Sequence, residues 1–296
     1  MRTCVIFNPT ARGDKARRFR RHLDGIAKEA TLKLTAAAGD ARRLAAEAVG
    51  EGAEIVVAAG GDGTVNEVLN GIGDAPEGFA QARLGVLPLG TVNVFARELA
   101  LPTKLDLAWE VIRQGREATI DLPWVDYNAN GSPTRRYFVQ LAGAGLDARA
   151  IKLVKWQVKK AIGPLAYIAA GLHALLGAPS KIEVLAGAQR TTGELVLIGN
   201  GRLYGGQFRL FPKADLRDGL LEVCVLPKVN WATLCRCSPA LLLSGTLPAA
   251  VTKVFQVETL TLTSAADTPV QIDGELVGHL PATFSLKRSG LQVIVP

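Results

Sequence analysis

The chain contains 296 residues, of which 48% are hydrophobic, and carries a formal net charge of +7. This length and composition exclude a disordered or fibrous protein and favour one large or two medium-sized domains. Residues 1–8 lead directly into a strand-like pattern without the segments of a secretion signal, so we expect a cytoplasmic protein. The excess positive charge suits nucleotide phosphates, nucleic acid or an anionic bilayer, and composition does not choose among them.

The four cysteines and three histidines form no metal-binding pattern. Cys235 and Cys237 are separated by one residue, which matches neither a CxxC redox pair nor a zinc knuckle. We therefore expect reduced thiols. The histidines are scattered and lack HExxH-type spacing, so we expect no histidine-based metal site.

Strands and helices alternate through the first third of the chain. We expect strands at 3–8, 32–35, 54–58 and 84–88, and helices at 14–30, 40–49, 64–72, 92–99 and 105–114. Single helices between strands imply parallel pairing with right-handed crossovers. The pattern predicts an α/β domain over residues 1–117.

From residue 118 the pattern changes to short strands separated by turns. We expect strands at 119–127, 137–142, 182–185, 194–198, 220–226, 254–263, 270–272 and 291–295, with a turn at 130–133. Many short strands with glycine and proline between them are typical of a sandwich or barrel. A second, β-rich domain is therefore predicted over residues 118–296.

Residues 147–162 are predicted to form an amphipathic helix with Lys152, Lys155 and Lys159 on one side and an apolar stripe on the other. Such a helix suits attachment to a membrane surface, but a solvated lysine face over a core helix explains the pattern equally well. The uncharged run 161–180 is long enough to span a bilayer. Its glycines and its proline favour a buried or interfacial helix instead.

Residues 59–64, Ala-Gly-Gly-Asp-Gly-Thr, lie between an expected strand and the start of an expected helix. Glycines at this point let backbone amides approach phosphate oxygens, and the helix N-terminus favours anions. Asp62 is then placed for magnesium or the nucleotide. The alternative is an ordinary tight turn, and the chain has no Walker A motif. A second stretch, Leu-Pro-Leu-Gly-Thr-Val-Asn at 87–93, also follows a strand, and two such turns in one parallel sheet are what a nucleotide crevice requires.

These motifs resemble the catalytic domain shared by diacylglycerol kinases, sphingosine kinases and their bacterial relatives. The resemblance extends to Asn8-Pro9 followed by Gly13, to residues 143–148, to Asp218-Gly219-Leu220 and to Asp273-Gly274-Glu275. It implies an N-terminal parallel-sheet nucleotide-binding domain, a C-terminal β-sandwich domain, and an active site in the cleft between them.

The resemblance also implies site residues. Those that would bind ATP are Asn8, Thr35, Gly60, Gly61, Asp62, Gly63, Thr64, Val65, Asn66 and Thr91. We add Arg12 and Lys15 as phosphate contacts, because a basic loop after the first strand could fold over the phosphates. A magnesium site would fall on Asp218 with main-chain oxygens of Asp215 and Leu220, and hard oxygen ligands suit this ion. An ordinary Asp-Gly hairpin turn is the alternative there.

The Asp273-Gly274-Glu275 element would supply the general base, by resemblance at Glu275, with Asp273 as the other candidate carboxylate. A carboxylate is suited to orienting the attacking hydroxyl and accepting its proton late. One departure concerns Val94, where the family usually carries aspartate in a Gly-Asn-Asp-Phe sequence. This difference leaves the identity of the acceptor lipid open.

The resemblance thus implies an ATP- and Mg2+-dependent lipid kinase acting on diacylglycerol or a related lipid. We expect it at the inner face of the membrane, bound peripherally to anionic phospholipid, with no nucleic acid partner and with a homodimer left open. Three rival interpretations are an NAD kinase-like enzyme, an inactive membrane-binding homologue, and an oxidoreductase in which residues 143–148 form a GxGxxA fingerprint. The last lacks the expected acidic residue about twenty positions on.

Overall fold

Two compact units make up the chain in the computed structural model, which describes residues 1–9, 22–129, 131–145, 180–206 and 208–296. Unit 1 consists of Met1–Leu122 and Lys287–Pro296, and unit 2 of Pro123–Leu286. The sequence analysis placed the last strand wholly in the second domain. Its C-terminal part belongs to unit 1 because Val293 pairs in parallel with Leu84.

Unit 1 is built on a parallel sheet with the strand order β2-β1-β3-β4. The strands are β1 (Thr3–Phe7), β2 (Thr31–Leu34), β3 (Ile55–Gly60) and β4 (Arg83–Pro88). Every residue of β3 is buried, as expected for a parallel strand covered on both faces. This confirms the parallel α/β domain predicted from the alternation of strands and helices.

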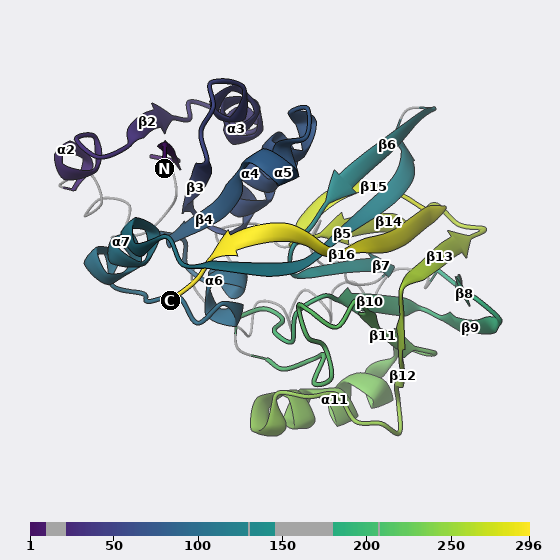
Figure 1. The fold of residues 1–296 in the computed structure, drawn as a ribbon. Coiled ribbons are helices and arrows are strands. Elements are labelled where there is room, and N and C mark those ends of the chain that lie inside the picture. Colours follow the sequence, from purple (N-terminus) through teal and green to yellow (C-terminus); the bar gives the residue numbers. More distant parts are fainter. Residues whose placement is uncertain (10–21, 130, 146–179, 207) are drawn as a thin grey trace. The chain divides into compact units, whose positions relative to one another are not determined.

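Helices cover both faces of this sheet (Figure 1). The described helices are α2 (Leu23–Ile26), α3 (Asp40–Gly50), α4 (Asp62–Asp74), α5 (Gly78–Gln81), α6 (Val94–Glu98) and α7 (Leu105–Gln114). α3 packs closely on α4, where Gly71 leaves no room for a side chain beside the Arg42 carbonyl group. α7 packs on β4, where Gly85 makes space for Ile112.

The strand order fixes where a ligand would bind in unit 1. From β1 the chain first adds β2 on one side and then β3 on the other. In such open sheets the ligand crevice lies outside the carboxyl ends of the strands where the order reverses. The segments after β1 and β3, which begin at Asn8 and Gly61, are therefore at the position that binds ligands in this architecture.

Unit 2 contains two layers of antiparallel strands. One sheet has the order β12-β11-β10-β7-β14-β15, and the other pairs β13 with β8 and β16, β8 with β9, and β5 with β6. The strands are β5 (Glu117–Ala129), β6 (Ser132–Tyr137), β7 (Leu141–Gly145), β8 (Ile182–Ala186), β9 (Gln189–Gly193), β10 (Leu195–Gly199), β11 (Leu221–Leu226), β12 (Lys253–Val257), β13 (Thr259–Ser264), β14 (Pro269–Ile272), β15 (Glu275–His279) and β16 (Ala282–Ile294). This confirms the predicted β-sandwich.

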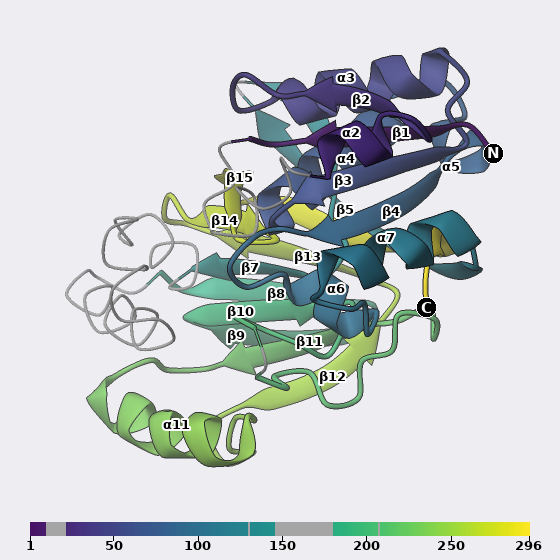
Figure 2. The same ribbon diagram turned by 90° about the vertical axis from the view of Figure 1, so that its left-hand side faces the viewer.

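Strand β10 is buried on both faces of its sheet. Val196 and Ile198 point into the sandwich core, where Phe138 and Phe284 meet edge to face with ring centroids 6.5 Å apart. Leu197 belongs to a separate apolar cluster on the other face. That cluster includes residues of helix α11 (Trp231–Ser244), which lies beyond β11 and β12 (Figure 2).

Several elements differ from the sequence predictions. The expected strand at 137–142 is interrupted between β6 and β7, because the amides of Val139 and Gln140 bond to the side chain of Asp273. The expected strand at 254–263 is two strands, β12 and β13, which belong to different sheets. α11 was not predicted. The helix expected at 14–30 ends at Ile26 in the described part, since residues 27–30 form a turn after Gly25, and residues 10–21 lie outside the described residues.

Candidate active site

The β3–α4 connection forms a tight loop at the carboxyl end of the sheet in unit 1. Gly60 ends β3, Gly61 is the N-cap residue, and Asp62 begins α4. Gly60 must lack a side chain because a Cβ atom there would collide with the side chain of Thr64. First-turn amides of a helix have no carbonyl partner one turn earlier, so this loop offers donors and a positive dipole end to an anion.

A second loop, after β4, packs directly on the first. The amides of Leu89 and Gly90 donate to the Gly60 carbonyl oxygen at 2.9 and 3.1 Å. A Cβ atom on Gly90 would lie 2.6 Å from the Gly61 Cα atom, so the two backbones meet without side chains between them. Asn93, at a φ of 53°, closes the second loop through bonds of 3.0 and 2.7 Å with the Gly90 amide and carbonyl.

Polar side chains connect these loops to each other and to β1. The Asp62 Oδ1 atom accepts from the amide of Phe95, in α6, at 3.4 Å. Asn8 follows β1, and its Nδ2 atom donates to the Thr64 Oγ1 atom at 3.4 Å. An acidic residue in the first turn is favourable with respect to the helix dipole. The structure thus brings together Asn8, the glycine loop, Asp62 and Thr64, as the sequence predicted.

The other residues predicted to bind the nucleotide differ in exposure and in their contacts. Thr35 follows β2, where its amide donates to the Phe7 carbonyl oxygen at 3.0 Å, and its side chain is buried. Thr91 is exposed on the second loop. The side chains of Val65 and Asn66 are buried within unit 1, and Asn66 bonds to Asn70 rather than facing solvent. Arg12 and Lys15 lie outside the described residues.

Glu67 is a residue of this region that the sequence analysis missed. Its carboxylate accepts from the amides of Gly39 and Ala41, both at 3.0 Å, and so bonds to the N-terminus of α3. Asp40 accepts from the amides of Ala36 and Ala37 at 2.8 and 2.9 Å. These bonds fix the loop that follows Thr35. Both partners are remote in sequence from Glu67, so no local signal could have identified this role.

In unit 2, Asp273 and Glu275 lie on a two-residue hairpin between β14 and β15. Asp273 and Gly274 have φ values of 47° and 86°, and Ile272 pairs with Glu275. Positive φ at both central residues is typical of a type I′ turn, for which Asp-Gly is a preferred sequence. Asp273-Gly274 therefore forms an ordinary hairpin turn, and this turn also positions the two carboxylates.

The Asp273 carboxylate is engaged by the loop between β6 and β7. It accepts from the amides of Val139, Gln140 and Leu141 at 3.0, 3.0 and 3.1 Å, and the Asp273 amide donates to the Leu141 carbonyl oxygen at 2.8 Å. Three amide donors stabilise the ionised carboxylate and occupy three of its about four lone-pair sites. Glu275 begins β15 and is half-exposed. The Asp273 carboxylate is thus bound to the backbone of this loop.

The predicted magnesium turn lies between residues 215 and 220. The Asp218 Oδ1 atom accepts from the Leu220 amide at 2.8 Å, and Oδ2 accepts from the Gln256 side chain at 3.2 Å. The Asp215 carbonyl oxygen accepts from the Asp218 amide at 3.3 Å. Gly219 has a φ of 73°, which allows the tight reversal. Within the described residues, no three acidic, histidine or cysteine side chains converge as a metal site.

Glu222 adds a feature beside this turn that the sequence analysis missed. The residue is fully buried, its Oε2 atom accepts from the Lys213 amide at 2.8 Å, and its Oε1 atom has no hydrogen-bond partner. Burial raises the pKa of this carboxyl above its usual value, and the Asp218 charge acts in the same direction. The metal-ligand candidates around the turn are hard oxygens, and the Glu222 Oε1 atom nearby accepts no hydrogen bond. This donor set fits magnesium by type.

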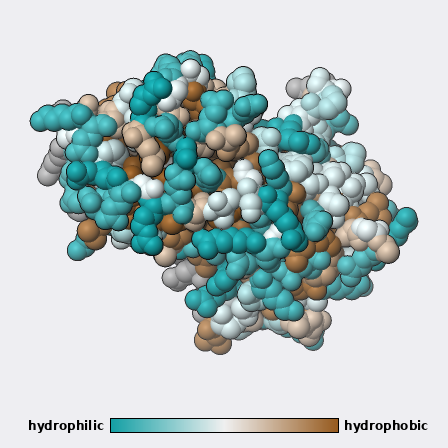
Figure 3. All heavy atoms as spheres, viewed as in Figure 1, coloured by the Kyte–Doolittle hydropathy of each residue, from teal (hydrophilic) through white to brown (hydrophobic). Residues whose placement is uncertain are grey.

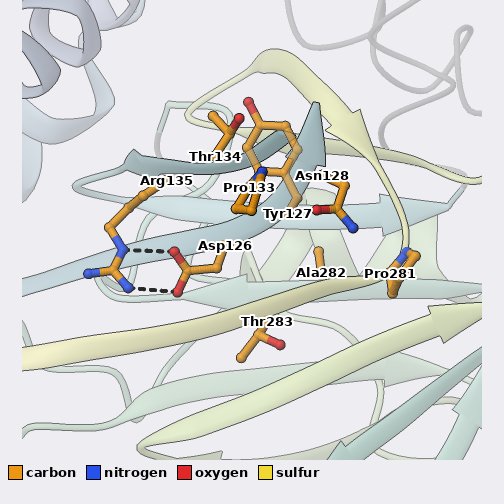
Figure 4. A pocket seen from close by; sticks show the side chains of 9 residues that line it. All are labelled: Asp126, Tyr127, Asn128, Pro133, Thr134, Arg135, Pro281, Ala282 and Thr283. Atoms are coloured by element: carbon orange, nitrogen blue, oxygen red, sulfur yellow. Dashed lines mark hydrogen bonds and ion pairs between the residues drawn. The ribbon is translucent and has the colours of Figure 1, made fainter. Parts of the chain in front are cut away.

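An open hollow of about 490 Å³ lies elsewhere in unit 2 and contains none of the predicted site residues (Figure 4). On its wall, Arg135 bonds to both carboxylate oxygens of Asp126 at 2.7 and 2.9 Å and lies over the Trp124 ring at 4.6 Å. Burial opposes ionisation, yet the bonds from Arg135 and Trp124 hold the pKa of Asp126 below its usual value. The charges in this hollow are already paired, which favours a structural role.

Two further predictions concern residues near these sites. Val94 begins α6, and its side chain is buried. Residues 143–145 lie in β7, which pairs antiparallel with β10 and β14. A dinucleotide fingerprint requires a parallel βαβ unit, so this pairing overturns the oxidoreductase interpretation.

The predicted basic helix at 147–162 and all of the apolar run at 161–180 except Ser180 lie outside the described residues. No helix of the described part is long and apolar enough to cross a membrane.

Known proteins are similar to this chain over its whole length. The family model of the diacylglycerol kinase catalytic domain matches residues 2–125, and that of the YegS C-terminal NAD kinase beta sandwich-like domain matches residues 140–295. The diacylglycerol kinase of Staphylococcus carnosus (strain TM300) is 29% identical, with 100% of this chain and 95% of the relative covered. That of Staphylococcus aureus (strain MRSA252) is 30% identical, with 100% and 92% covered. A crystal structure of a diacylglycerol kinase from Bacillus anthracis str. Sterne superposes with a TM-score of 0.77 at 21% identity, covering 100% of this chain and 97% of the other, which shows the same fold.

Proposed function

Because this chain belongs to the diacylglycerol kinase family and is a diacylglycerol kinase-like lipid kinase, we propose that it transfers the γ-phosphoryl group of ATP to a lipid hydroxyl in a magnesium-dependent reaction. The acceptor in this proposal is diacylglycerol or a lipid of similar structure. The curated relatives are named as diacylglycerol kinases, which supports this acceptor class.

The observation that carries the proposal is the contact between the two glycine loops of unit 1. Gly61 and Gly90 meet backbone to backbone at the carboxyl end of the sheet, beside the N-terminus of α4. The absence of both side chains leaves room for phosphate oxygens beside the first-turn amides of α4, which is what binding a triphosphate requires. Asn8, Asp62 and Thr64 surround the same point with polar groups.

In the proposed reaction, the acceptor hydroxyl oxygen forms a bond with the γ-phosphorus as the bridging bond to the β-phosphate breaks. ADP leaves, and the hydroxyl proton passes to the Glu275 carboxylate. Glu275 is the better candidate because the Asp273 carboxylate already accepts from three amides. We assign Asp273 the positioning of the hairpin that carries Glu275.

Asp218, with the main-chain oxygens of Asp215 and Leu220, would hold magnesium in unit 2. A bound magnesium ion neutralises negative charge that develops during phosphoryl transfer. The chain's own contribution is the rigid turn: the Leu220 amide and the Gln256 side chain orient the Asp218 carboxylate before any ion binds. Glu222, which is buried beside this turn, bonds to the Lys213 amide through its carboxyl group.

The proposal is tested with the purified full chain, ATP labelled on its γ-phosphate, and a panel of acceptors: short-chain diacylglycerol, other hydroxyl-bearing lipids, and NAD. We expect label in a lipid product, no transfer to NAD, and loss of transfer when magnesium is chelated. Transfer to NAD alone would support an NAD kinase-like activity instead. Absence of transfer to any acceptor, with ATP still bound, would support an inactive homologue.

We also propose peripheral association with the inner face of the membrane, since the acceptor resides in a bilayer. The net charge of +7 supports a preference for anionic lipids. Binding should weaken as salt is added, because the attraction is screened within a Debye length of about 8 Å at physiological ionic strength. Equal sedimentation with neutral and anionic vesicles would contradict this.

A further inference from the structure

Helix α11 presents an apolar face to solvent. We define the outer face of α11 as its exposed residues that share one side, namely Trp231, Ala232, Cys235, Arg236, Pro239 and Leu243. Trp231 is 61% exposed and Leu243 is 89% exposed, which is unusual for such large apolar side chains. Figure 3 shows some hydrophobic residues at the surface at the lower edge of the view, where α11 lies. Apolar groups gathered in this way mark an interaction site.

The opposite side of the same helix already has its packing partner. Cys237 and Leu241 belong to the apolar cluster that covers Leu197 and Leu226 of the sheet. Residues four apart lie on one stripe of a helix, so the spacing of Trp231, Cys235, Pro239 and Leu243 turns the outer face away from that cluster. α11 is therefore apolar on two sides, whereas a helix that only covers a sheet needs one.

Positive charges lie on this outer face and at both ends of α11. Residues 223–257 contain no aspartate or glutamate, Arg236 lies on the face itself, and the Lys228 carbonyl oxygen accepts from the Thr233 hydroxyl group in the first turn of the helix. Arg209 is exposed and follows Phe208, and the backbone of both residues lies beside Gly245, at the C-terminal end of α11. Glu194 lies near the N-terminal end of α11, where its carboxylate accepts from the Val229 amide at 2.7 Å. The combination is an apolar strip with a basic border.

We propose that the outer face of α11 is a membrane-docking surface that lies in the headgroup region of a bilayer containing anionic phospholipid. This inference rests on the proposed function, because a lipid kinase must reach an acceptor in a membrane. The helix has 14 residues, which at about 1.5 Å each is shorter than the hydrocarbon core of about 30 Å, so it lies in the interface instead of crossing it. Tryptophan is suited to that depth, and the basic border is suited to lipid phosphates.

A second copy of the chain fits this surface less well. A twofold contact places the same patch against itself, so it would bring Arg236 and its cationic neighbours together. One face of a 14-residue helix also offers little of the roughly 800 Å² per partner that stable interfaces bury. A bilayer of anionic lipid avoids both difficulties, because its charge is complementary and its surface is continuous.

The chain supplies its own reporter for this docking surface. Cys235 is exposed on the outer face, whereas the other three cysteines are buried. Burial raises the pKa of the thiol to about 11 at Cys4 and to about 12 at Cys224, so these groups react slowly with thiol reagents. A polarity-sensitive fluorophore on Cys235 should shift to the blue with equimolar phosphatidylcholine and phosphatidylglycerol vesicles, and less with phosphatidylcholine alone.

The matched control moves the label to an exposed leucine of another helix. The double variant Cys235→Ser, Leu107→Cys carries the fluorophore on α7, where Leu107 is 54% exposed. We expect no blue shift from this position. An equal shift from both labels would show nonspecific adsorption and overturn the proposal, as would the absence of a shift at Cys235.

Vesicle affinity tests the same surface without a label. Leu243→Glu should weaken binding to the mixed vesicles about tenfold or more, because a charge replaces an apolar group that enters the interface. Arg236→Glu should remove most of the preference for anionic vesicles, and Leu107→Glu, the matched control, should change neither. Unchanged vesicle binding in Leu243→Glu overturns the proposal, and unchanged binding with conversion of a dimer to a monomer would show that the face is an interface between copies.

Transfer to monomeric short-chain diacylglycerol separates this inference from the proposed function. Leu243→Glu should retain wild-type turnover on this soluble acceptor and lose turnover on vesicle-bound lipid. Absence of lipid phosphorylation by the wild type would refute the proposed function. Normal phosphorylation without any effect of Leu243→Glu on vesicles would refute only the docking role of α11.

Discussion

Replacing each carboxylate of the β14–β15 hairpin by its amide should separate structural support from catalysis. Asp273→Asn leaves one carbonyl oxygen for the three amides that now bond to the carboxylate. At best two neutral hydrogen bonds remain, and the new NH2 group faces the Val139 amide. Glu275 begins β15 and is half-exposed, and glutamine keeps the size of its side chain.

The magnitudes follow from these bonds. A hydrogen bond to a charged group contributes about 2 kcal/mol and a neutral one about 1 kcal/mol. Asp273→Asn loses one charged bond and turns two others into neutral ones, which together lower the free energy of unfolding by about 4 kcal/mol. This value is an upper bound because the carboxylate is partly exposed to solvent. We expect a fall in melting temperature of up to roughly 10 °C. Glu275→Gln should change the melting temperature little.

Turnover should show the reverse order, measured by label transfer from ATP to short-chain diacylglycerol well below both melting temperatures. Glu275→Gln should lower turnover roughly 10²- to 10⁴-fold with little change in ATP affinity, because it removes only the proton acceptor. Asp273→Asn should retain a larger share of turnover. A stable, inactive Asp273→Asn beside an active Glu275→Gln would show that the base is Asp273, and two active variants would show that the hairpin has no catalytic role.

Three further outcomes are expected. Gly90→Ala should weaken ATP binding about tenfold or more because its Cβ atom meets Gly61. The control Gly50→Ala should bind ATP normally, since nothing lies within 4 Å of a Cβ atom there. Equal affinities of the two variants in a binding titration would contradict the loop contact. Asp218→Ala should abolish the rise in melting temperature on adding magnesium, and an unchanged rise would place the ion elsewhere. Folding lowers the pKa of Asp126 below its ordinary value of 3.8, so the ionised Asp126 stabilises the fold above pH 3.8 and this contribution is lost as the pH falls further. The melting curves of Asp126→Asn and the wild type should therefore converge only in acid.

The parts of the fold that the sequence predicted depend on local patterns. β3 is a continuous run of buried apolar residues that ends at Gly60, where a side chain would strike Thr64. Both signals are contained within a few adjacent residues. The same holds for the Asp-Gly turn before Glu275. Where geometry follows from neighbouring residues, the sequence predicts the element and its chemistry together.

Helix α11 could not be predicted in this way because its apolar residues have no single period. Cys237 and Leu241 face the sheet, whereas Trp231 and Leu243 face solvent. Pro239 lies inside the helix and normally argues against one. A hydrophobic pattern identifies a helix only when one side is polar, so a helix with two apolar sides appears as an undifferentiated apolar segment.

The bonds that hold the Asp273 carboxylate come from contacts that no local pattern contains. The loop at residues 139–141 that engages Asp273 is also held by Asn200, whose Nδ2 atom donates to the Val139 carbonyl oxygen at 2.9 Å and whose amide donates to the Gln140 carbonyl oxygen at 2.9 Å. Asn200 is fully buried. Side chains from two separate segments of unit 2 therefore fix one loop, and that loop binds the Asp273 carboxylate through three amides. The surroundings of Asp273 are thus set by segments more than sixty residues away in sequence.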